Sequence, residues 1–332
     1  MFFNDTIIDK LIQLPTPFYY YDVSIFEITI QRAVSAAKKI NGQIHYALKA
    51  NHQDRLIQIL SKYDIGADCV SGGEIKKALE NDILPDSIVF AGVGKTDEEI
   101  TYALSQNIFC LNVESIQELE VINDIARGLN KRANIAIRIN PNVDAFTHKF
   151  ITTGLNENKF GINASDIPVV LDKLNVLNHL NLIGLHFHIG SQITDLSSFK
   201  NLCLKVNEIQ RYLAERDVYV NHLNMGGGLG INYTQPDENL FPDFENYFNL
   251  FDEFLEKRKQ QQLHFELGRS LVAQCGALIT KVLYHKVSGH KNFLIVDSGM
   301  NHLIRPALYE AYHKIENISV KFHQVVDGGY LN

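Results

Sequence analysis

The residue best placed to do chemistry is Lys49, in the stretch His45-Tyr46-Ala47-Leu48-Lys49-Ala50-Asn51. Residues 43–50 have the apolar, β-branched and aromatic composition of a short buried strand, which places Lys49 at its carboxyl end. Burial there disfavours the charged ammonium, and a neutral amine can form a Schiff base with a carbonyl. The alternative is an ordinary lysine that leaves a strand. A phosphate cradle, a ring partner and a carboxylate elsewhere in the chain would favour the chemical interpretation.

The glycine-rich run Met225-Gly226-Gly227-Gly228-Leu229-Gly230 is the candidate phosphate cradle. Consecutive glycines let backbone N–H groups surround an anion without obstruction by side chains. The run lacks the lysine of a nucleotide-binding P-loop and the spacing of a dinucleotide fingerprint. A flexible turn is the alternative interpretation. The hydroxyl of Ser191, directly after Gly190, offers a further donor to a phosphate.

His186 and His188 alternate along a predicted strand and therefore share one face of it. Three interpretations remain open: a zinc pair, hydrogen-bonded core histidines, or an aromatic plate beneath a flat cofactor ring. No carboxylate-rich partner set supports zinc, and we favour the plate for His188 in combination with Lys49. Glu266 closes another strand, and if buried it requires a cationic partner such as a pyridinium nitrogen.

Two arginines present planar guanidinium groups that suit carboxylates. Arg269 ends the stretch Glu266-Leu267-Gly268-Arg269, and Arg305 lies in Ile304-Arg305-Pro306-Ala307-Leu308-Tyr309. Taken alone, either arginine is more typical of a surface ion pair.

The elements that must position these side chains alternate along the chain. Apolar strands are predicted at 43–50, 65–71, 87–92, 109–113, 134–140, 182–190, 220–226 and 263–268. Helices between them, such as 96–106 and 115–129, begin with Thr or Ser followed three residues later by Glu. Eight such units predict a parallel (β/α)8 TIM barrel, and a doubly wound open sheet is the alternative. Six features fall at or just past the carboxyl ends of different strands, where barrel active sites are built. They are Lys49, Asp68, Arg138, His188, the Gly226–Gly228 run and Glu266.

Beyond residue 270 the pattern changes to β segments at 270–289 and 292–298, and residues 18–21 form another possible strand. We expect three parts: 1–25 joins a second, mainly β domain, 26–270 is the barrel, and 271–332 completes that domain only in part. The loop from 141 to 161 is long for a barrel connection, which is typical of a lid or a binding loop. It carries Asp144, Thr147, His148, Lys149 and Lys159.

Composition narrows the class of partner. The 332 residues carry a net charge of −7, which argues against nucleic acid and anionic membrane surfaces as partners. Four scattered cysteines, Cys69, Cys110, Cys203 and Cys275, have no spacing typical of a metal or redox site. The N-terminus does not resemble a signal peptide, and no stretch approaches the ~20 apolar residues of a spanning helix. We therefore expect a cytoplasmic protein without a bound metal.

The combined motifs closely resemble the fold-type III pyridoxal-phosphate decarboxylases, and within them the diaminopimelate decarboxylases. The resemblance runs from about Pro17 to Ile315. Its matching stretches are His45–Asn51, Gly66–Glu74, Asn140–Gly161, His186–Gln192, Gly226–Gly230, Glu266–Arg269 and Asp297–His313.

This resemblance implies a cofactor, pyridoxal 5'-phosphate, and a role for each matching residue. Lys49 and His188 are the implied catalytic residues, because Lys49 bears the cofactor and His188 stacks on its ring. The implied cofactor-binding residues are Lys49, His188, Ser191, Gly227, Gly228, Glu266, Gly268 and Arg269. The residues implied to meet the substrate are Arg269, Arg305 and Tyr309.

The implied reaction is decarboxylation of meso-2,6-diaminopimelate to L-lysine and CO2, in a homodimer with shared active sites. A related small amino-acid substrate such as carboxynorspermidine is one alternative, and an inactive cofactor-binding homologue is another. Two departures from the family stand out. Leu267 replaces a usual proline, and 316–332 lacks the family's Cys-Glu-Ser segment and late tyrosine. We expect a truncated β domain with exposed apolar faces and impaired activity.

Overall fold

The computed structural model describes residues 3–143 and 160–319. It divides into two compact units. The barrel unit comprises Glu27–Gly230 and Asp243–Val272, and the β unit comprises Met1–Phe26, Ile231–Pro242 and Ala273–Asn332. Most of the predicted binding loop, with Asp144, Thr147, His148, Lys149 and Lys159, lies outside the described residues, as does the sequence after Ser319.

The barrel unit contains eight parallel strands that close on themselves, because β10 pairs with β2 and β5 pairs with β6. The strands are β2 Gly42–Ala47, β3 Gly66–Cys69, β4 Ile88–Phe90, β5 Cys110–Val113, β6 Ala133–Asn140, β8 Leu180–His186, β9 His222–Asn224 and β10 Gln262–Leu267. A short ninth strand, β7 Ile162–Asn163, pairs with the end of β6. The predicted TIM barrel is confirmed, and the open sheet is wrong.

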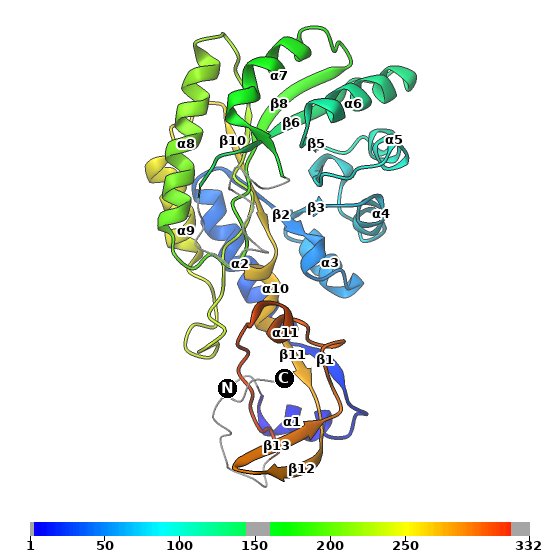
Figure 1. Ribbon diagram of the computed structural model, residues 1–332, viewed down its shortest axis with the longest axis vertical. Coiled ribbons are helices and arrows are strands. Elements are labelled where there is room, and N and C mark those ends of the chain that lie inside the picture. The colour runs from blue at the N-terminus through cyan, green and yellow to red at the C-terminus, as the bar shows by residue number, and fades with distance from the viewer. Residues whose placement is uncertain (1–2, 144–159, 320–332) are drawn as a thin grey trace. The chain divides into compact units, whose positions relative to one another are not determined.

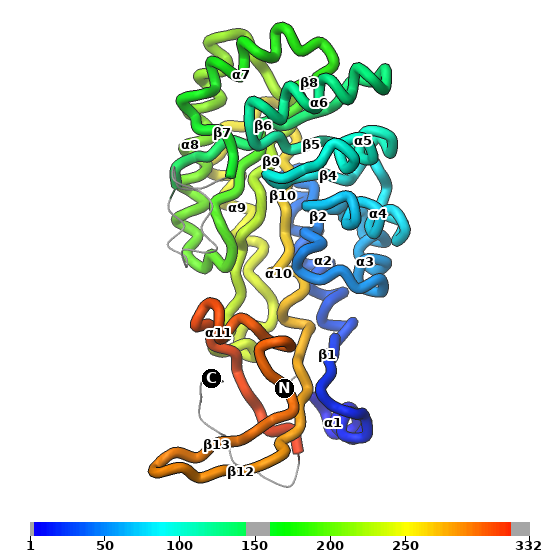
Figure 2. Tube along the Cα trace, turned by 45° about the vertical axis from the view of Figure 1, so that its right-hand side comes forward, coloured from blue at the N-terminus to red at the C-terminus, as the bar shows by residue number. Residues whose placement is uncertain are grey.

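Helices surround these strands, as Figures 1 and 2 show. They are α2 Val23–Lys39, α3 Asp54–Ser61, α4 Gly72–Glu80, α5 Asp97–Gln106, α6 Ile116–Gly128, α7 Ile167–Leu174, α8 Ser197–Ala214, α9 Phe244–Phe254 and α10 Arg269–Val272. The predicted caps are present. Thr96 and Glu99 form a reciprocal capping box at α5, and the Ser115 hydroxyl accepts from the backbone N–H of Glu118 at α6.

Large aromatic side chains fill the space between α8, α9 and β10. Tyr247 lies at the centre, with ring centroids 5.0 Å from Phe199 and 5.1 Å from both Phe248 and Phe251. Phe265 of β10 packs edge-on against Phe248 at 4.9 Å. All five are fully buried, so this cluster fixes β10, the strand that carries Glu266.

The β unit contains two small antiparallel sheets. Strand β1 Phe18–Tyr21 pairs with β11 Gly276–Ile279, and β12 Val282–Ser288 pairs with β13 Lys291–Val296. Helices α1 Asp5–Leu11 and α11 Arg305–Tyr309 complete it. The expected apolar exposure is present on the second sheet, where Tyr284 is 70% exposed and Val287 63%.

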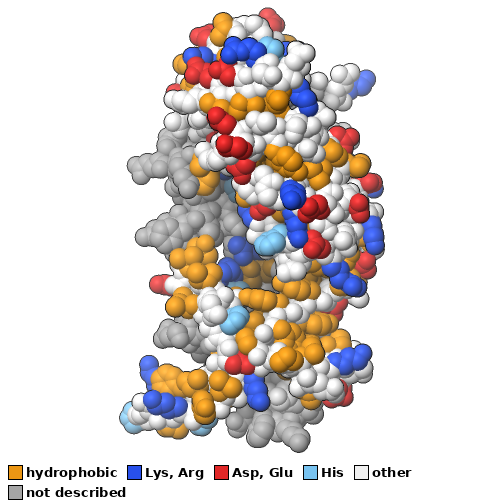
Figure 3. All heavy atoms as spheres, turned by 90° about the vertical axis from the view of Figure 1, so that its right-hand side faces the viewer, with side chains coloured by type: hydrophobic (Ala, Val, Ile, Leu, Met, Phe, Trp, Pro, Cys, Tyr) orange, Lys and Arg blue, Asp and Glu red, His pale blue; other side chains and the backbone are white. Residues whose placement is uncertain are grey.

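The molecular surface agrees with the modest net charge. Acidic and basic side chains are interspersed on the face shown in Figure 3. In the part of the chain that the structure describes, no helix combines the length and apolar character needed to cross a membrane.

Candidate active site

Lys49 lies just beyond the strand that was predicted to carry it. Strand β2 ends at Ala47, and Leu48–Ala50 form a single 3-10 turn. Gly268, at the end of β10, packs against this turn: a Cβ there would lie 3.1 Å from the Cβ atoms of both Ala47 and Ala50. The glycine therefore allows β10 to approach the lysine turn closely.

The ammonium of Lys49 faces a buried carboxylate on the adjacent strand. Its Nζ is 3.5 Å from Oδ2 of Asp68, because Asp68 pairs in register with Ala47 across β2 and β3. The Lys49 side chain is 53% exposed, whereas that of Asp68 is 1% exposed. The second carboxylate oxygen of Asp68, Oδ1, is buried without a hydrogen-bond partner among the described residues.

The expectation that burial keeps Lys49 neutral is wrong. The negative charge of Asp68 raises the pKa of Lys49, and this effect outweighs burial, which would lower it. The pKa of Asp68 itself is raised to about 7, first by burial and then by the charge of Glu266. The pair is therefore a charged lysine beside a carboxyl group that titrates near neutrality.

Glu266 is the centre of a buried hydrogen-bond network inside the barrel. Its Oε2 is 3.0 Å from Nε2 of His186, and its Oε1 accepts from the side-chain amides of Asn112 (3.1 Å) and Asn224 (2.7 Å). Burial would raise the pKa of Glu266, but His186, which is hydrogen-bonded to it, and the nearby charge of Lys49 lower it below the ordinary value. Glu266 is therefore an ionised carboxylate, held by neighbours from three other strands.

A second buried charge network lies at the carboxyl ends of β4, β5 and β6. Arg138 Nη1 donates to Glu114 Oε1 at 2.7 Å, and the same carboxylate accepts from the backbone N–H of Gly92 (2.8 Å) and Gly161 (3.1 Å). Burial would raise the pKa of Glu114, but Arg138 and other cations lower it. Glu114 thus holds Arg138, whose positive charge acts to lower the pKa of Lys49.

The glycine run is mainly a packing device. A Cβ at Gly226 would lie 2.2 Å from the carbonyl oxygen of Phe187, and one at Gly227 would lie 1.9 Å from that of Glu266. Gly228 has φ of +111°, and a Cβ there would lie 2.6 Å from the carbonyl oxygen of Gly190. The run is thus wedged between the ends of β8 and β10, a role that its composition did not reveal.

Two backbone N–H groups of the run are already used. The N–H of Gly226 donates to Asn224 Oδ1 at 2.9 Å, and that of Gly227 donates to His188 Nδ1 at 3.2 Å. The expectation that the whole run surrounds an anion is therefore corrected for these two residues.

His188 accepts through Nδ1, and burial, followed by Arg138 and Lys49, holds its pKa well below the ordinary value. Its ring is neutral.

The structure brings two predicted phosphate and substrate residues together. Arg269 Nη2 donates to the hydroxyl oxygen of Ser191 at 3.3 Å. Ser191 follows Gly190, which contacts the Gly228 turn, so the pair lies at the edge of the glycine run. A hydroxyl and a guanidinium side by side can both donate to an anion.

The remaining two predicted residues, Arg305 and Tyr309, lie on α11 in the β unit. The guanidinium of Arg305 lies over the ring of Tyr233, 4.3 Å from its centroid. Its Nη1 is 2.9 Å from Nε2 of His313, whose ring packs against Tyr233 at 4.7 Å. Arg305 is therefore held in a defined orientation.

Sequence reasoning missed the residues that complete the site. Asp68 and Arg138 were noted only for their places at strand ends, and Asn112, Asn224 and Glu114 were not singled out. What these residues share is a side chain that faces the inside of the barrel near the carboxyl end of a strand. Because side chains alternate along a strand, each of them lies two residues from another inward-facing side chain, and this spacing is the signal in the sequence. In the described residues no group of three His, Cys, Asp or Glu side chains could hold a metal ion, and His186 is instead part of the buried hydrogen-bond network of Glu266.

Comparison with known proteins agrees with this geometry. Residues 27–273 match the model of the family described as pyridoxal-dependent decarboxylase, pyridoxal binding domain. Diaminopimelate decarboxylase from Bacteroides thetaiotaomicron is 52% identical over 313 residues, which cover 94% of this chain and 81% of that protein. The enzyme of the same name from Aquifex aeolicus is 41% identical, over 92% of this chain and 72% of that protein.

A solved structure shows the same sequence identity to this chain as the Aquifex aeolicus enzyme. Diaminopimelate decarboxylase from Helicobacter pylori, crystallised with L-lysine, superposes with a TM-score of 0.86 at 41% identity, covering 92% of this chain and 76% of that one. Lysine decarboxylase from Selenomonas ruminantium, at 19% identity and a TM-score of 0.79, shares the fold. The chain belongs to the pyridoxal-dependent decarboxylase family.

Proposed function

We propose that this chain binds pyridoxal 5'-phosphate at Lys49 and decarboxylates meso-2,6-diaminopimelate to L-lysine and CO2. The observation that carries the proposal is the charged Lys49–Asp68 pair, at 3.5 Å, in the same barrel unit as the ionised Glu266 network. The substrate assignment is supported by relatives at 52% and 41% identity that are diaminopimelate decarboxylases. The similar Helicobacter pylori enzyme binds L-lysine, which is the proposed product.

The residues present fit this cofactor. Buried polar atoms are almost always hydrogen-bonded, and Oδ1 of Asp68, which has no partner among the described residues, is available to a donor group of a ligand beside Lys49. Asp68, whose pKa of about 7 allows it to accept the ammonium proton, lies 3.5 Å from the half-exposed Lys49 Nζ, so the amine can be freed to attack a carbonyl carbon. The neutral ring of His188 suits a stacking partner, and we assign Ser191, Gly228 and Arg269 to the phosphate. Gly227 and Gly268 serve by allowing the strand ends to approach each other.

When bound, pyridoxal phosphate supplies a ring that accepts the electron pair released as the bond to the departing carboxylate breaks. The chain's own residues then have separate tasks. Glu266 is ionised and can hold a proton on a ring nitrogen placed beside it. Asp68 keeps a proton on Lys49 Nζ, where it is available to replace the lost carboxylate. His186 and the two asparagines fix Glu266, so its charge requires no rearrangement during the reaction.

We assign the substrate's carboxylates to Arg269, Arg305 and Tyr309. The support is the family resemblance, together with the way Tyr233 and His313 hold Arg305. An arginine already held in one orientation loses little side-chain entropy when it binds a carboxylate. Orientation of the substrate from its far end is a general means of raising the rate at the reacting carbon.

The test is turnover by the purified chain loaded with pyridoxal phosphate. We expect equal amounts of CO2 and L-lysine from meso-2,6-diaminopimelate, with kcat/KM at least ~100-fold above that for ornithine or arginine. Release of CO2 from carboxynorspermidine but not from diaminopimelate would reassign the substrate. Cofactor binding with no turnover of any of these amino acids would identify an inactive homologue.

We further propose that the chain acts as a homodimer in the cytoplasm. The resemblance supports the dimer, and the location is supported by Cys69, Cys110, Cys203 and Cys275, which are all free thiols and all buried. Light scattering coupled to size-exclusion chromatography tests the dimer: a monomer at micromolar concentration would contradict it.

A further inference from the structure

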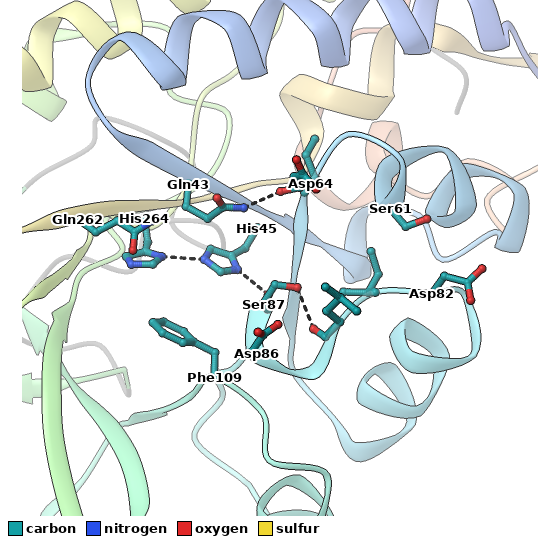
Figure 4. A pocket seen from close by; sticks show the side chains of 13 residues that line it. Gln43, His45, Ser61, Asp64, Asp82, Asp86, Ser87, Phe109, Gln262 and His264 are labelled. Atoms are coloured by element: carbon teal, nitrogen blue, oxygen red, sulfur yellow. Dashed lines mark hydrogen bonds between the residues drawn. The ribbon is translucent and has the colours of Figure 1, made fainter.

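Three histidines form an unbroken hydrogen-bond chain on the amino side of the barrel, apart from the residues assigned to the cofactor. Nδ1 of His45 is 2.9 Å from the carbonyl oxygen of Ser87, and its Nε2 is 2.9 Å from Nδ1 of His264. Nε2 of His264 is in turn 2.9 Å from Nδ1 of His222. Figure 4 shows the first two contacts, with the ring of Phe109 beside them.

Chemistry fixes the direction of this chain. A carbonyl oxygen can only accept, so Nδ1 of His45 must carry its hydrogen. A neutral imidazole has one N–H, which leaves Nε2 of His45 as an acceptor for Nδ1–H of His264. The same reasoning makes Nε2 of His264 the acceptor for Nδ1–H of His222. All three neutral rings are therefore Nδ1–H tautomers, and Nε2 of His222, which bonds to none of the described residues, is the open acceptor at the end.

The same count limits how much charge the chain can hold. One added proton at Nε2 of His222 leaves every hydrogen bond intact, and it can be relayed inward to His264 or His45 with all bonds kept. A second added proton would place two N–H groups against each other in one of the 2.9 Å contacts. The three rings thus have a capacity of one proton.

Two glycines and one aromatic ring beside the three histidines accommodate their hydrogen bonds. A Cβ at Gly66 would lie 2.1 Å from the Ser87 carbonyl oxygen and 2.6 Å from Nδ1 of His45, so only glycine leaves room for that bond. At the other end, a Cβ at Gly184 would lie 2.7 Å from the carbonyl oxygen of His222. The ring of Phe109 stacks on that of His264, with centroids 5.2 Å apart.

Charged groups around the chain favour a proton, while burial opposes it. A cavity of about 270 Å³ gives access to His45 and His264, and its lining includes Asp64, Asp82 and Asp86 and contains neither Lys nor Arg. Glu266 follows His264 by two residues on β10 and is paired in register with His45. Burial lowers the pKa of all three histidines, and the charge of Glu266 partly offsets this for His45 and His264.

We propose that His45, His264 and His222 act together as a single proton-binding site that is electrostatically coupled to Glu266. A proton on the chain favours the ionised form of Glu266, and by linkage the charge of Glu266 favours the proton. Protonation of the three histidines at lower pH therefore changes the electrostatic potential at Glu266, and through Glu266 the potential in the proposed cofactor pocket. Five of the six ring nitrogens are used in bonds to the Ser87 carbonyl or to one another, and no metal-ligating group of three occurs in the described ranges.

The test is nitrogen NMR of the histidine rings in the full 332-residue chain. At pH 8 we expect all three to be Nδ1–H tautomers, the less common form in free histidine. On acidification the three rings should shift together and take up one proton in total. If any of the three histidines is an Nε2–H tautomer at pH 8, the proposed hydrogen-bond arrangement of His45, His264 and His222 is wrong. Uptake of two protons by the folded protein, or of none before it unfolds, would overturn the proposed site.

Two variants sharpen this measurement. In His222→Asn the side-chain amide can donate to His264 Nε2 in the neutral state and, after a flip, accept from it in the charged state, so His45 and His264 should still take up one proton between them. His179→Asn is the matched control, since His179 is half-buried and its ring is hydrogen-bonded to the carbonyl oxygen of Lys131 at 3.0 Å. This variant should leave the titration of His45, His264 and His222 unchanged. Glu266→Gln should move the chain's titration to lower pH. Uptake of two protons, or of none, by His45 and His264 in His222→Asn would contradict the proposal, as would an unchanged titration in Glu266→Gln.

Discussion

Replacement of Gly227 by alanine should destabilise the barrel severely, although it adds a single methyl group. The added Cβ would lie 1.9 Å from the carbonyl oxygen of Glu266, so the end of β10 must retreat by about 1.5 Å to reach ordinary contact. That movement endangers two hydrogen bonds of 2.8 Å, from Glu266 N–H to Gly226 and from Met225 N–H to His264. At about 1 kcal/mol each, with local strain added, we expect a loss of about 3–5 kcal/mol.

Urea unfolding followed by circular dichroism measures this loss, because the chain has no tryptophan for fluorescence. Gly94→Ala is the control, since a Cβ at Gly94 would meet nothing within 4 Å. A Gly227→Ala variant within about 0.5 kcal/mol of wild type would refute the view that the glycine run exists for strand packing. If the run served only as an anion cradle, Gly227→Ala would lose cofactor affinity at unchanged stability.

Three further changes test other parts of the structure. Tyr247→Phe removes a buried hydroxyl that has no partner among the described residues, so stability should be unchanged or up to about 1 kcal/mol higher, and a loss larger than that would mean that the hydroxyl is bonded. Burial raises the pKa of Asp68 to about 7, so the cofactor-free wild type should lose stability as pH rises from about 4 to 7 while Asp68→Asn does not. A stability difference between the two that is independent of pH would contradict this. His313→Ala removes the acceptor that orients Arg305 and should raise KM for diaminopimelate about 10-fold with kcat unchanged, whereas the exposed control His285→Ala should match wild type. A fall in kcat at unchanged KM would contradict the orienting role.

The barrel and its strand ends could be predicted from sequence because they depend on local periodicity. Apolar strand segments recur with capped helices between them, and Lys49, His188 and Glu266 follow such segments. The end of β2 was less predictable: the strand stops at Ala47 and turns, and Gly268 packs against this turn. That contact joins residues more than two hundred positions apart, which no local pattern reveals.

The electrostatics of the site could not be predicted, because they depend on which residues become neighbours across strands. Asp68 reverses the expected effect of burial on Lys49 only because the β2–β3 register places it beside the lysine. Similarly, His45, His222 and His264 are unremarkable in sequence and form a chain only when β10 is inserted between β2 and β9.

The most direct test of the account is to find where the cofactor is attached. Borohydride reduction of the chain loaded with pyridoxal phosphate, followed by peptide mapping, should place the label on the peptide that contains Lys49. Lys49→Ala should lose both the label and the visible absorbance of the bound cofactor. Lys95 is a useful internal comparison, because its side chain is 1% exposed and its ammonium is bonded to Glu118 at 2.6 Å, so it should remain unlabelled. Label on Lys95, or undiminished label in Lys49→Ala, would contradict the assignment on which the proposed chemistry rests.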